Sequence, residues 1–141
     1  MKKILLPFVL STLLMGETVM AQTIEMVIGE RAFTVELIEH EAARSFADRL
    51  PMTLTFENFG STERIAYLKQ PLTIGSAPTA TDPKLGDLAY YIPWGNICVF
   101  VKDFRHSEDL VPMGKMSSEA TKALKESGNQ PVTFRPVEKK Q

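Results

Sequence analysis

The sequence predicts a mainly β fold: a closed or nearly closed β-barrel with two short helices. Three observations indicate it. Roughly six to eight short segments are rich in β-forming residues, and turn-forming residues separate them. Only two short stretches show helical spacing, and they do not alternate with strands as helices do in parallel α/β folds. A small antiparallel protein removes its exposed sheet edges most completely by closing into a barrel.

The first 21 residues have the layout of a secretory signal peptide. Lys2 and Lys3 give a basic start, residues 4–15 are an apolar run, and small residues precede a cleavage point after Ala21. The apolar run is too short to span a bilayer, and a membrane anchor is the less favoured alternative. We therefore expect residues 1–21 to be removed on export and residues 22–141 to form one periplasmic or secreted domain.

The charge and cysteine content exclude several classes of protein. Sixteen Lys and Arg residues against 17 Asp and Glu residues give a formal net charge of −1. Such a surface does not favour nucleic acid, or an anionic membrane after signal removal, as the partner. Cys98 is the only cysteine, so the domain has no internal disulfide and its stability comes from packing. The sequence does not predict an oligomeric state.

No motif for a cofactor or a metal stands out. The sequence has no glycine-rich phosphate loop and no nucleophile elbow. Residues 40–44 resemble a zinc-binding helix only as far as Arg44, a cation where the second histidine ligand would stand. His106 lies near Asp103 and Glu108, which suits a metal site or, as we prefer, a solvated polar turn. We expect no cofactor and no metal.

The first expected elements are a hairpin and a short helix. Residues 23–29 and 32–38 are rich in β-formers and are separated by a glycine-containing turn, which predicts a β-hairpin. Residues 43–50 carry apolar side chains at helical spacing. Pro51 ends this helix, because proline lacks the backbone donor and disfavours helix in the residue before it.

The middle of the chain predicts two strands and a long loop. Residues 52–59 alternate between apolar and polar side chains, as a half-buried strand does. After a turn at residues 60–62, a further strand is expected from Arg64 to Leu68. Residues 70–84 contain three prolines and predict an irregular segment. Such a segment forms the wall of a binding site or is simply flexible.

The last third predicts two strands, a helix and a closing extended segment. Residues 88–92 and 96–101 have strand composition. Ser117 suits the N-cap of a helix, with a glutamate in the first turn and lysines in the last turns, and Gly128 suits its end. Residues 131–137 complete the chain as an extended segment.

Two stretches resemble the cyclophilin-like proteins of bacteria and archaea. They are LPMTLTFENFGSTERIAYLKQPL, from Leu50, and GDLAYYIPWGNICVFVKDFRHSEDLVPMGKM, from Gly86. The most distinctive part is the run from Tyr90 to Asn96, and the resemblance covers nearly all of residues 22–141. It implies a cyclophilin-like eight-stranded β-barrel closed by two short helices, in agreement with the element-by-element prediction.

The resemblance does not carry an activity with it. Cyclophilins that are prolyl isomerases have their arginine in an F-H-R-type segment and shape the proline pocket with an N-G-S-Q-F-type segment, and this sequence contains neither string. Isomerisation needs a donor to the rotating amide, whose barrier is about 20 kcal/mol, and an apolar slot for the proline ring. Arg64 is the candidate donor, chosen for its chemistry and not by a motif match.

The aromatic residues around the turn Ile92-Pro93-Trp94-Gly95 support a binding site. Alternate side chains of a barrel strand point inward, so we expect most aromatic side chains of the flanking strands to fill the barrel. Trp94 stands at the tip of the turn, where a large apolar side chain meets water. We expect it to fold back over the open end of the barrel, and the alternative is that it lines a ligand groove.

These observations give three hypotheses for the function. The first is an exported binding module that holds a small molecule or an extended peptide in an aromatic-lined groove. The second is a peptidyl-prolyl cis-trans isomerase acting on exported proteins with Arg64 as the catalytic donor, and the third is a purely structural role. Cys98 is expected to be a buried structural thiol, since no histidine stands near it as a base. The residues expected to bind the ligand are Arg64, Tyr67, Tyr91, Trp94, Phe100 and Phe104.

Overall fold

The protein is described by a computed structural model covering residues 19–138; most of the expected signal peptide lies outside this range. The helices are α1 (Glu41–Ala47) and α2 (Ser118–Lys125). None of the described helices is long and apolar enough to cross a membrane. The strands are β1 (Met20–Ile28), β2 (Arg31–Ile38), β3 (Met52–Thr55), β4 (Glu57–Phe59), β5 (Glu63–Tyr67), β6 (Ala80–Thr81), β7 (Asp87–Tyr91), β8 (Asn96–Phe100), β9 (Ser107–Glu108), β10 (Leu110–Met116) and β11 (Pro131–Pro136).

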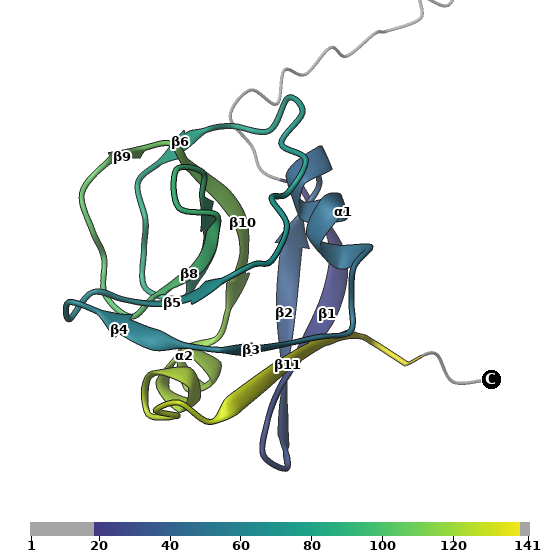
Figure 1. The fold of residues 1–141 in the computed structure, drawn as a ribbon, viewed down its shortest axis with the longest axis vertical. Coiled ribbons are helices and arrows are strands. Elements are labelled where there is room, and N and C mark those ends of the chain that lie inside the picture. The colour runs from purple at the N-terminus through teal and green to yellow at the C-terminus, as the bar shows by residue number, and fades with distance from the viewer. Residues whose placement is uncertain (1–18, 139–141) are drawn as a thin grey trace, which may run out of the picture.

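Nine of these strands form one curved antiparallel sheet, in the order β3-β11-β1-β2-β10-β7-β8-β5-β4 (Figure 1). The two edge strands, β3 and β4, are consecutive in the chain and meet at Phe56, which is buried. The chain itself therefore joins the two edges and nearly closes the barrel. The predicted fold class is confirmed, with nine strands instead of eight because the alternating run at residues 52–59 bends at Phe56 and pairs with both β11 and β5.

The barrel interior is filled from every side of the sheet. The β1–β2 hairpin forms as predicted, and the inward side chains of β1 are buried. Phe46 of α1 packs edge-to-face on Phe134 of β11, with ring centroids 5.6 Å apart. Leu124 of α2 belongs to the same apolar cluster. The two helices lie on opposite sides of the barrel, so each covers a different part of one core (Figure 1).

Side-chain caps fix where the helices begin. The His40 Nδ1 accepts a hydrogen bond from the Ala43 N–H at 3.1 Å, and α1 ends at Ala47, earlier than the apolar spacing predicted. The Ser117 Oγ accepts from the Ala120 N–H at 3.1 Å, as predicted for α2. Gly128 has a φ of 60°, which is the left-handed conformation expected of a glycine just after a helix.

Residues 70–84 do not form a loose excursion, and Thr73 among them borders an open pocket beside α1. Leu72 and Ala77 are buried in the barrel core, and the Leu72 N–H donates to the Tyr90 hydroxyl at 3.2 Å. Further along, β6 pairs with β9 in a separate two-stranded sheet. The segment therefore fills one end of the barrel and then supports the chain around residues 102–108.

Strand β8 positions the site, because it is buried on both of its faces. Its inward side chains, Ile97 and Val99, belong to the barrel core. Its outward side chains Cys98 and Phe100 belong to a second apolar cluster outside the barrel, together with Ile65, Ala89 and Leu110. The outer face of β8 is apolar, and Tyr91 and Phe104 pack against it. A cleft remains over the rest of this face.

Candidate functional site

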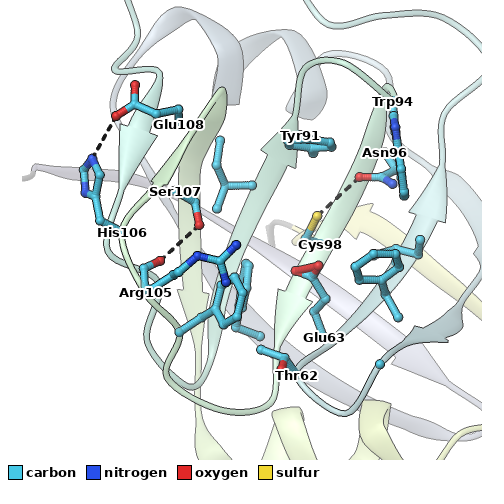
Figure 2. Close-up of a pocket in the computed structure, with 16 residues that line it drawn as sticks. Thr62, Glu63, Tyr91, Trp94, Asn96, Cys98, Arg105, His106, Ser107 and Glu108 are labelled. Carbon is cyan, nitrogen blue, oxygen red and sulfur yellow. Dashed lines mark hydrogen bonds and ion pairs between the residues drawn. The ribbon is translucent and has the colours of Figure 1, made fainter.

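An open cleft of about 420 Å³ lies on the outer face of the barrel wall. Its floor is the outer apolar face of β5, β8 and β10. Figure 2 shows Tyr91, Trp94, Asn96, Cys98 and Glu63 gathered toward one end, and Arg105, His106, Ser107 and Glu108 toward the other. The lining residues are Phe59, Gly60, Thr62, Glu63, Ile65, Tyr91, Trp94, Asn96, Cys98, Phe100, Phe104, Arg105, His106, Ser107, Glu108 and Leu110.

Three aromatic rings form one wall of the cleft. Trp94 lies edge-to-face with Phe59, with centroids 5.5 Å apart and planes at 82°, and with Tyr91, at 5.7 Å and 79°. The rings come from the turn after β7, the end of β4 and the end of β7. Such perpendicular pairs are favoured by the ring quadrupoles, so the wall is held by its own contacts.

Trp94 does not cap the barrel, and that expectation is wrong. Its side chain is 49% exposed and lies on the outer wall. The barrel end near the turn is already filled, because Tyr90 points inward and its hydroxyl accepts from the Leu72 N–H. Tyr91 points outward by strand alternation, and Trp94 packs against it. Trp94 therefore lines the outer cleft, and its role in binding a ligand stays a prediction.

The floor of the cleft carries a buried amide and a buried thiol. The Cys98 S–H donates to the Asn96 Oδ1, with sulfur and oxygen 3.3 Å apart. Burial, and then the nearby charge of Glu63, raise the pKa of the Cys98 thiol far above its usual range. The thiol stays protonated at neutral pH, so Cys98 is a packing and hydrogen-bonding group and not a nucleophile.

The Asn96 amide nitrogen faces the open cleft. Within residues 19–138, its Nδ2 has no hydrogen-bond acceptor. Across the same residues, every fully buried side-chain nitrogen or oxygen has a partner, so this Nδ2 is not sealed off from the cleft. Asn96 is only 1% exposed, and the N–H groups of its Nδ2 are therefore available to a molecule in the cleft.

Glu63 is the acidic group beside the floor. It is half-buried at the start of β5, and burial raises its pKa. In the described part of the chain no Lys, Arg or His forms an ion pair with it. An ionised carboxylate that is partly desolvated and lacks a cation lowers the stability of the folded state.

The opposite wall is the segment at residues 102–108. The Phe104 ring stacks on Phe100, with centroids 6.2 Å apart, and the Arg105 guanidinium lies 4.5 Å above the centre of the Phe104 ring. The Phe104 N–H donates to the Pro83 carbonyl at 3.0 Å. This wall is thus held from behind by the segment that contains β6.

His106 fastens the same wall. Its Nδ1 lies 2.7 Å from the Asp82 Oδ1, and its Nε2 lies 3.2 Å from the Glu108 Oε2. The hydrogen bonds to Asp82 and then to Glu108 raise the pKa of His106. Asp103, also weighed as a metal ligand, accepts from the Leu85 N–H. Residues 19–138 contain no cluster of three or more side chains suited to hold a metal.

Comparison with known proteins decides the family. A model of the cyclophilin-like family matches residues 26–135. The chain belongs to the cyclophilin-like family. The solution structure of a hypothetical protein from Archaeoglobus fulgidus is similar, with a TM-score of 0.63 and 24% identity over 87% of this chain and 100% of that chain. At this identity the likeness shows the fold alone. No curated protein matches the chain.

The cyclophilin-like barrel brings together four of the six residues expected to bind. Tyr91, Trp94, Phe100 and Phe104 line the cleft. Tyr67 is 51% exposed at the end of β5 and does not line it. Tyr91, Phe100 and Phe104 were expected mostly to fill the barrel, but they lie outside it because the outer face of β7 and β8 is itself apolar.

Arg64 is separated from the cleft and holds α2 in place. It is buried on the opposite face of β5 from Glu63 and Ile65. Its Nε donates to the Leu124 carbonyl at 3.1 Å, and the guanidinium also donates to the Ser127 Oγ and the Gly128 carbonyl. These acceptors lie at the C-terminal end of α2, where a cation is favoured by the helix dipole. Burial lowers the pKa of Arg64.

The sequence prediction missed Phe59, Glu63, Asn96 and Arg105 as lining residues. One signal could have found Glu63: extending the expected strand by one residue before Arg64 places Glu63 with Ile65 on the face opposite Arg64. The pairing of Glu63 with Phe100 and of Ile65 with Cys98 then assembles the floor. No local signal marks Arg105, whose place depends on the contacts of residues 102–108 with the segment behind them.

Proposed function

We propose that this chain is an exported cyclophilin-like binding protein that holds a small molecule or an extended peptide segment in the aromatic cleft. One observation carries the proposal: five aromatic side chains line a cleft in which Glu63 and the Asn96 amide nitrogen lack protein partners. Its volume of about 420 Å³ lies within the roughly 300–1,000 Å³ typical of ligand pockets. Apolar walls with a few free polar groups are the usual composition of such pockets.

Export is part of this proposal and is supported by the N-terminal sequence. The basic start, apolar run and small residues before Ala21 are typical of a cleaved signal. Cleavage after Ala21 would leave the β1–β2 pairs from Thr23↔Glu36 to Ile28↔Arg31 intact. A periplasmic or secreted location is thus compatible with the mature barrel.

The binding proposal is tested by a fragment screen with two matched variants. Fragments that quench the fluorescence of Trp94, the sole tryptophan, are titrated into the wild type, Phe59→Ala and Tyr67→Ala. Phe59 and Tyr67 are exposed to similar extents, 46% and 51%, but only Phe59 lines the cleft. We expect Phe59→Ala to weaken binding roughly tenfold or more, as for aromatic anchors, and Tyr67→Ala to leave it unchanged. Equal effects of the two variants would count against a binding cleft.

Prolyl isomerisation is the second proposal, with Arg105 in place of Arg64 as the donor. The observation that favours it is the apolar floor of Ile65, Phe100 and Leu110 lying in the same cleft as the Arg105 guanidinium. An isomerase assay on an X-Pro peptide, with Arg105→Ala and the exposed Arg44→Ala as control, tests it. Activity that falls only in Arg105→Ala supports it, and a wild type without activity rejects it.

A further inference from the structure

An acidic side chain, Glu63, lines the cleft. Glu63 has no ion-pair partner among residues 19–138. Arg105 also lines the cleft, with its guanidinium over the Phe104 ring, and the Lys102 Nζ donates to the Ser61 Oγ. A half-buried carboxylate without a counter-ion therefore attracts a cationic ligand in the cleft.

The aromatic wall near Glu63 favours the same sign of ligand. The faces of aromatic rings carry negative potential, and cations bind over them at up to about 6 Å from the ring centre. Trp94 is nearly perpendicular to both Phe59 and Tyr91, so the three rings that border this part of the cleft do not all face the same way. Two or three such rings beside a carboxylate are suited to an ammonium group, because a cation gains from both the ring faces and the carboxylate.

The remaining surfaces define the rest of the ligand. The Asn96 Nδ2 offers N–H donors at the floor, which suit an oxygen acceptor on the ligand. Ile65, Phe100 and Leu110 supply an apolar floor for an aliphatic or aromatic body. The cleft, at about 420 Å³, is large enough for a small molecule of this kind.

We propose that the cleft selects a small organic ammonium compound with an apolar body. Its cationic head lies against Glu63 and the rings of Phe59, Tyr91 and Trp94, and its body covers the apolar floor. This inference rests on the proposed binding function and specifies the chemical class of the ligand.

Three probes of the same shape and different charge test the selection. Phenethylammonium, phenethyl alcohol and phenylacetate are titrated by calorimetry into the wild type at pH 7 and fixed ionic strength. We expect phenethylammonium to bind roughly tenfold more tightly than the alcohol, from the charge and the ring faces together, and phenylacetate to bind most weakly. Equal affinity for the ammonium and the alcohol would overturn the cation inference while leaving the binding function in place.

The matched variants identify the groups responsible. Glu63→Gln should bring the affinity for phenethylammonium closer to that for phenethyl alcohol, leaving only the part that the ring faces contribute, and keep the affinity for the alcohol within about twofold of the wild type. Glu30→Gln, an exposed glutamate in the β1–β2 turn, should change none of the three affinities. Unfolding midpoints confirm that both variants are folded. A preference for the ammonium that is as large in Glu63→Gln as in the wild type would overturn the inference. Binding of none of the probes would reject the cation inference and the proposed cleft function together.

Discussion

Trp94 and Phe59 meet edge-to-face with ring centroids 5.5 Å apart, and this contact joins the turn between β7 and β8 to the end of β4. Two segments that are distant in the sequence thus form one continuous aromatic wall on the outside of the barrel. Both side chains are about half exposed, so the contact shapes a surface and does not fill the core. It places these aromatic side chains in the outer cleft and not in the barrel interior.

Trp94→Ala should cost little stability. Because half of the side chain is exposed, we expect the free energy of unfolding to fall by about 1 kcal/mol or less. The comparison is Phe46→Ala, which removes a fully buried ring and should cost about 3–5 kcal/mol. Urea unfolding followed by circular dichroism measures both. Losses of equal size would mean that Trp94 is part of the core after all.

Arg64→Ala should destabilise the fold without changing ligand affinity. The truncation removes a buried guanidinium that donates to the Leu124 and Gly128 carbonyls, and we expect a loss of about 2–3 kcal/mol. Arg64→Lys should recover only part of it, because an ammonium cannot reproduce the forked hydrogen bonds. Arg44→Ala, which breaks an exposed ion pair with Glu39, should cost about 0.5 kcal/mol or less. Chemical unfolding with a ligand titration checks this, and a stable Arg64→Ala variant that has lost binding would contradict it.

As the pH rises, the Glu63→Gln variant should become more stable than the wild type. Burial raises the folded-state pKa of Glu63 above its unfolded value, so the folded state holds this proton more tightly. The stabilising contribution of the protonated carboxyl is present below the unfolded pKa, about 4.3, and is lost as the pH rises through the folded pKa. Unfolding midpoints of wild type and variant should therefore diverge as the pH rises above about 4.3, with Glu63→Gln the more stable at the higher pH. Glu30→Gln should show no such divergence, and a gap that narrows with rising pH would contradict the assignment.

Cys98 should react slowly with thiol reagents. Its thiol is buried, donates to the Asn96 Oδ1 and has a raised pKa, so little thiolate exists at neutral pH. In a Ser76→Cys variant, which adds an exposed reference thiol in the loop at residues 70–84, labelling should show one fast and one slow phase. Labelling of both thiols at the same rate would show that the floor of the cleft opens readily to solvent.

The sequence predicted those elements whose signals are local. The β1–β2 hairpin follows from β-forming segments around a glycine turn, and α2 from a serine cap and a glycine stop. Strand β10 was not predicted, because Pro112 and Gly114 interrupt its pattern, and in the structure they coincide with a register shift against β7. The bend at Phe56 was also missed, since an alternating pattern does not reveal that one run pairs with two different strands.

The site depends on contacts that sequence patterns do not contain. Glu63 and Arg64 are neighbours on β5 with opposite roles, and alternation predicts only that they face opposite ways. Helix α2 covers the face of β5 that carries Arg64. The Leu124 carbonyl of α2, 60 residues further along the chain, accepts a hydrogen bond from Arg64. Likewise, residues 102–108 form a wall only because β9 pairs with β6.

The most direct test of the account is to locate bound phenethylammonium by the changes it causes in the amide NMR spectrum of the protein. If the outer cleft is the binding site, the largest shifts should fall on Phe59, Glu63, Tyr91, Trp94 and Asn96, with smaller shifts at residues 104–108. Residues of the barrel interior, and Tyr67 at the far end of β5, should stay unchanged. Shifts concentrated in the interior or around Arg64 and α2, with the cleft residues unaffected, would contradict the account.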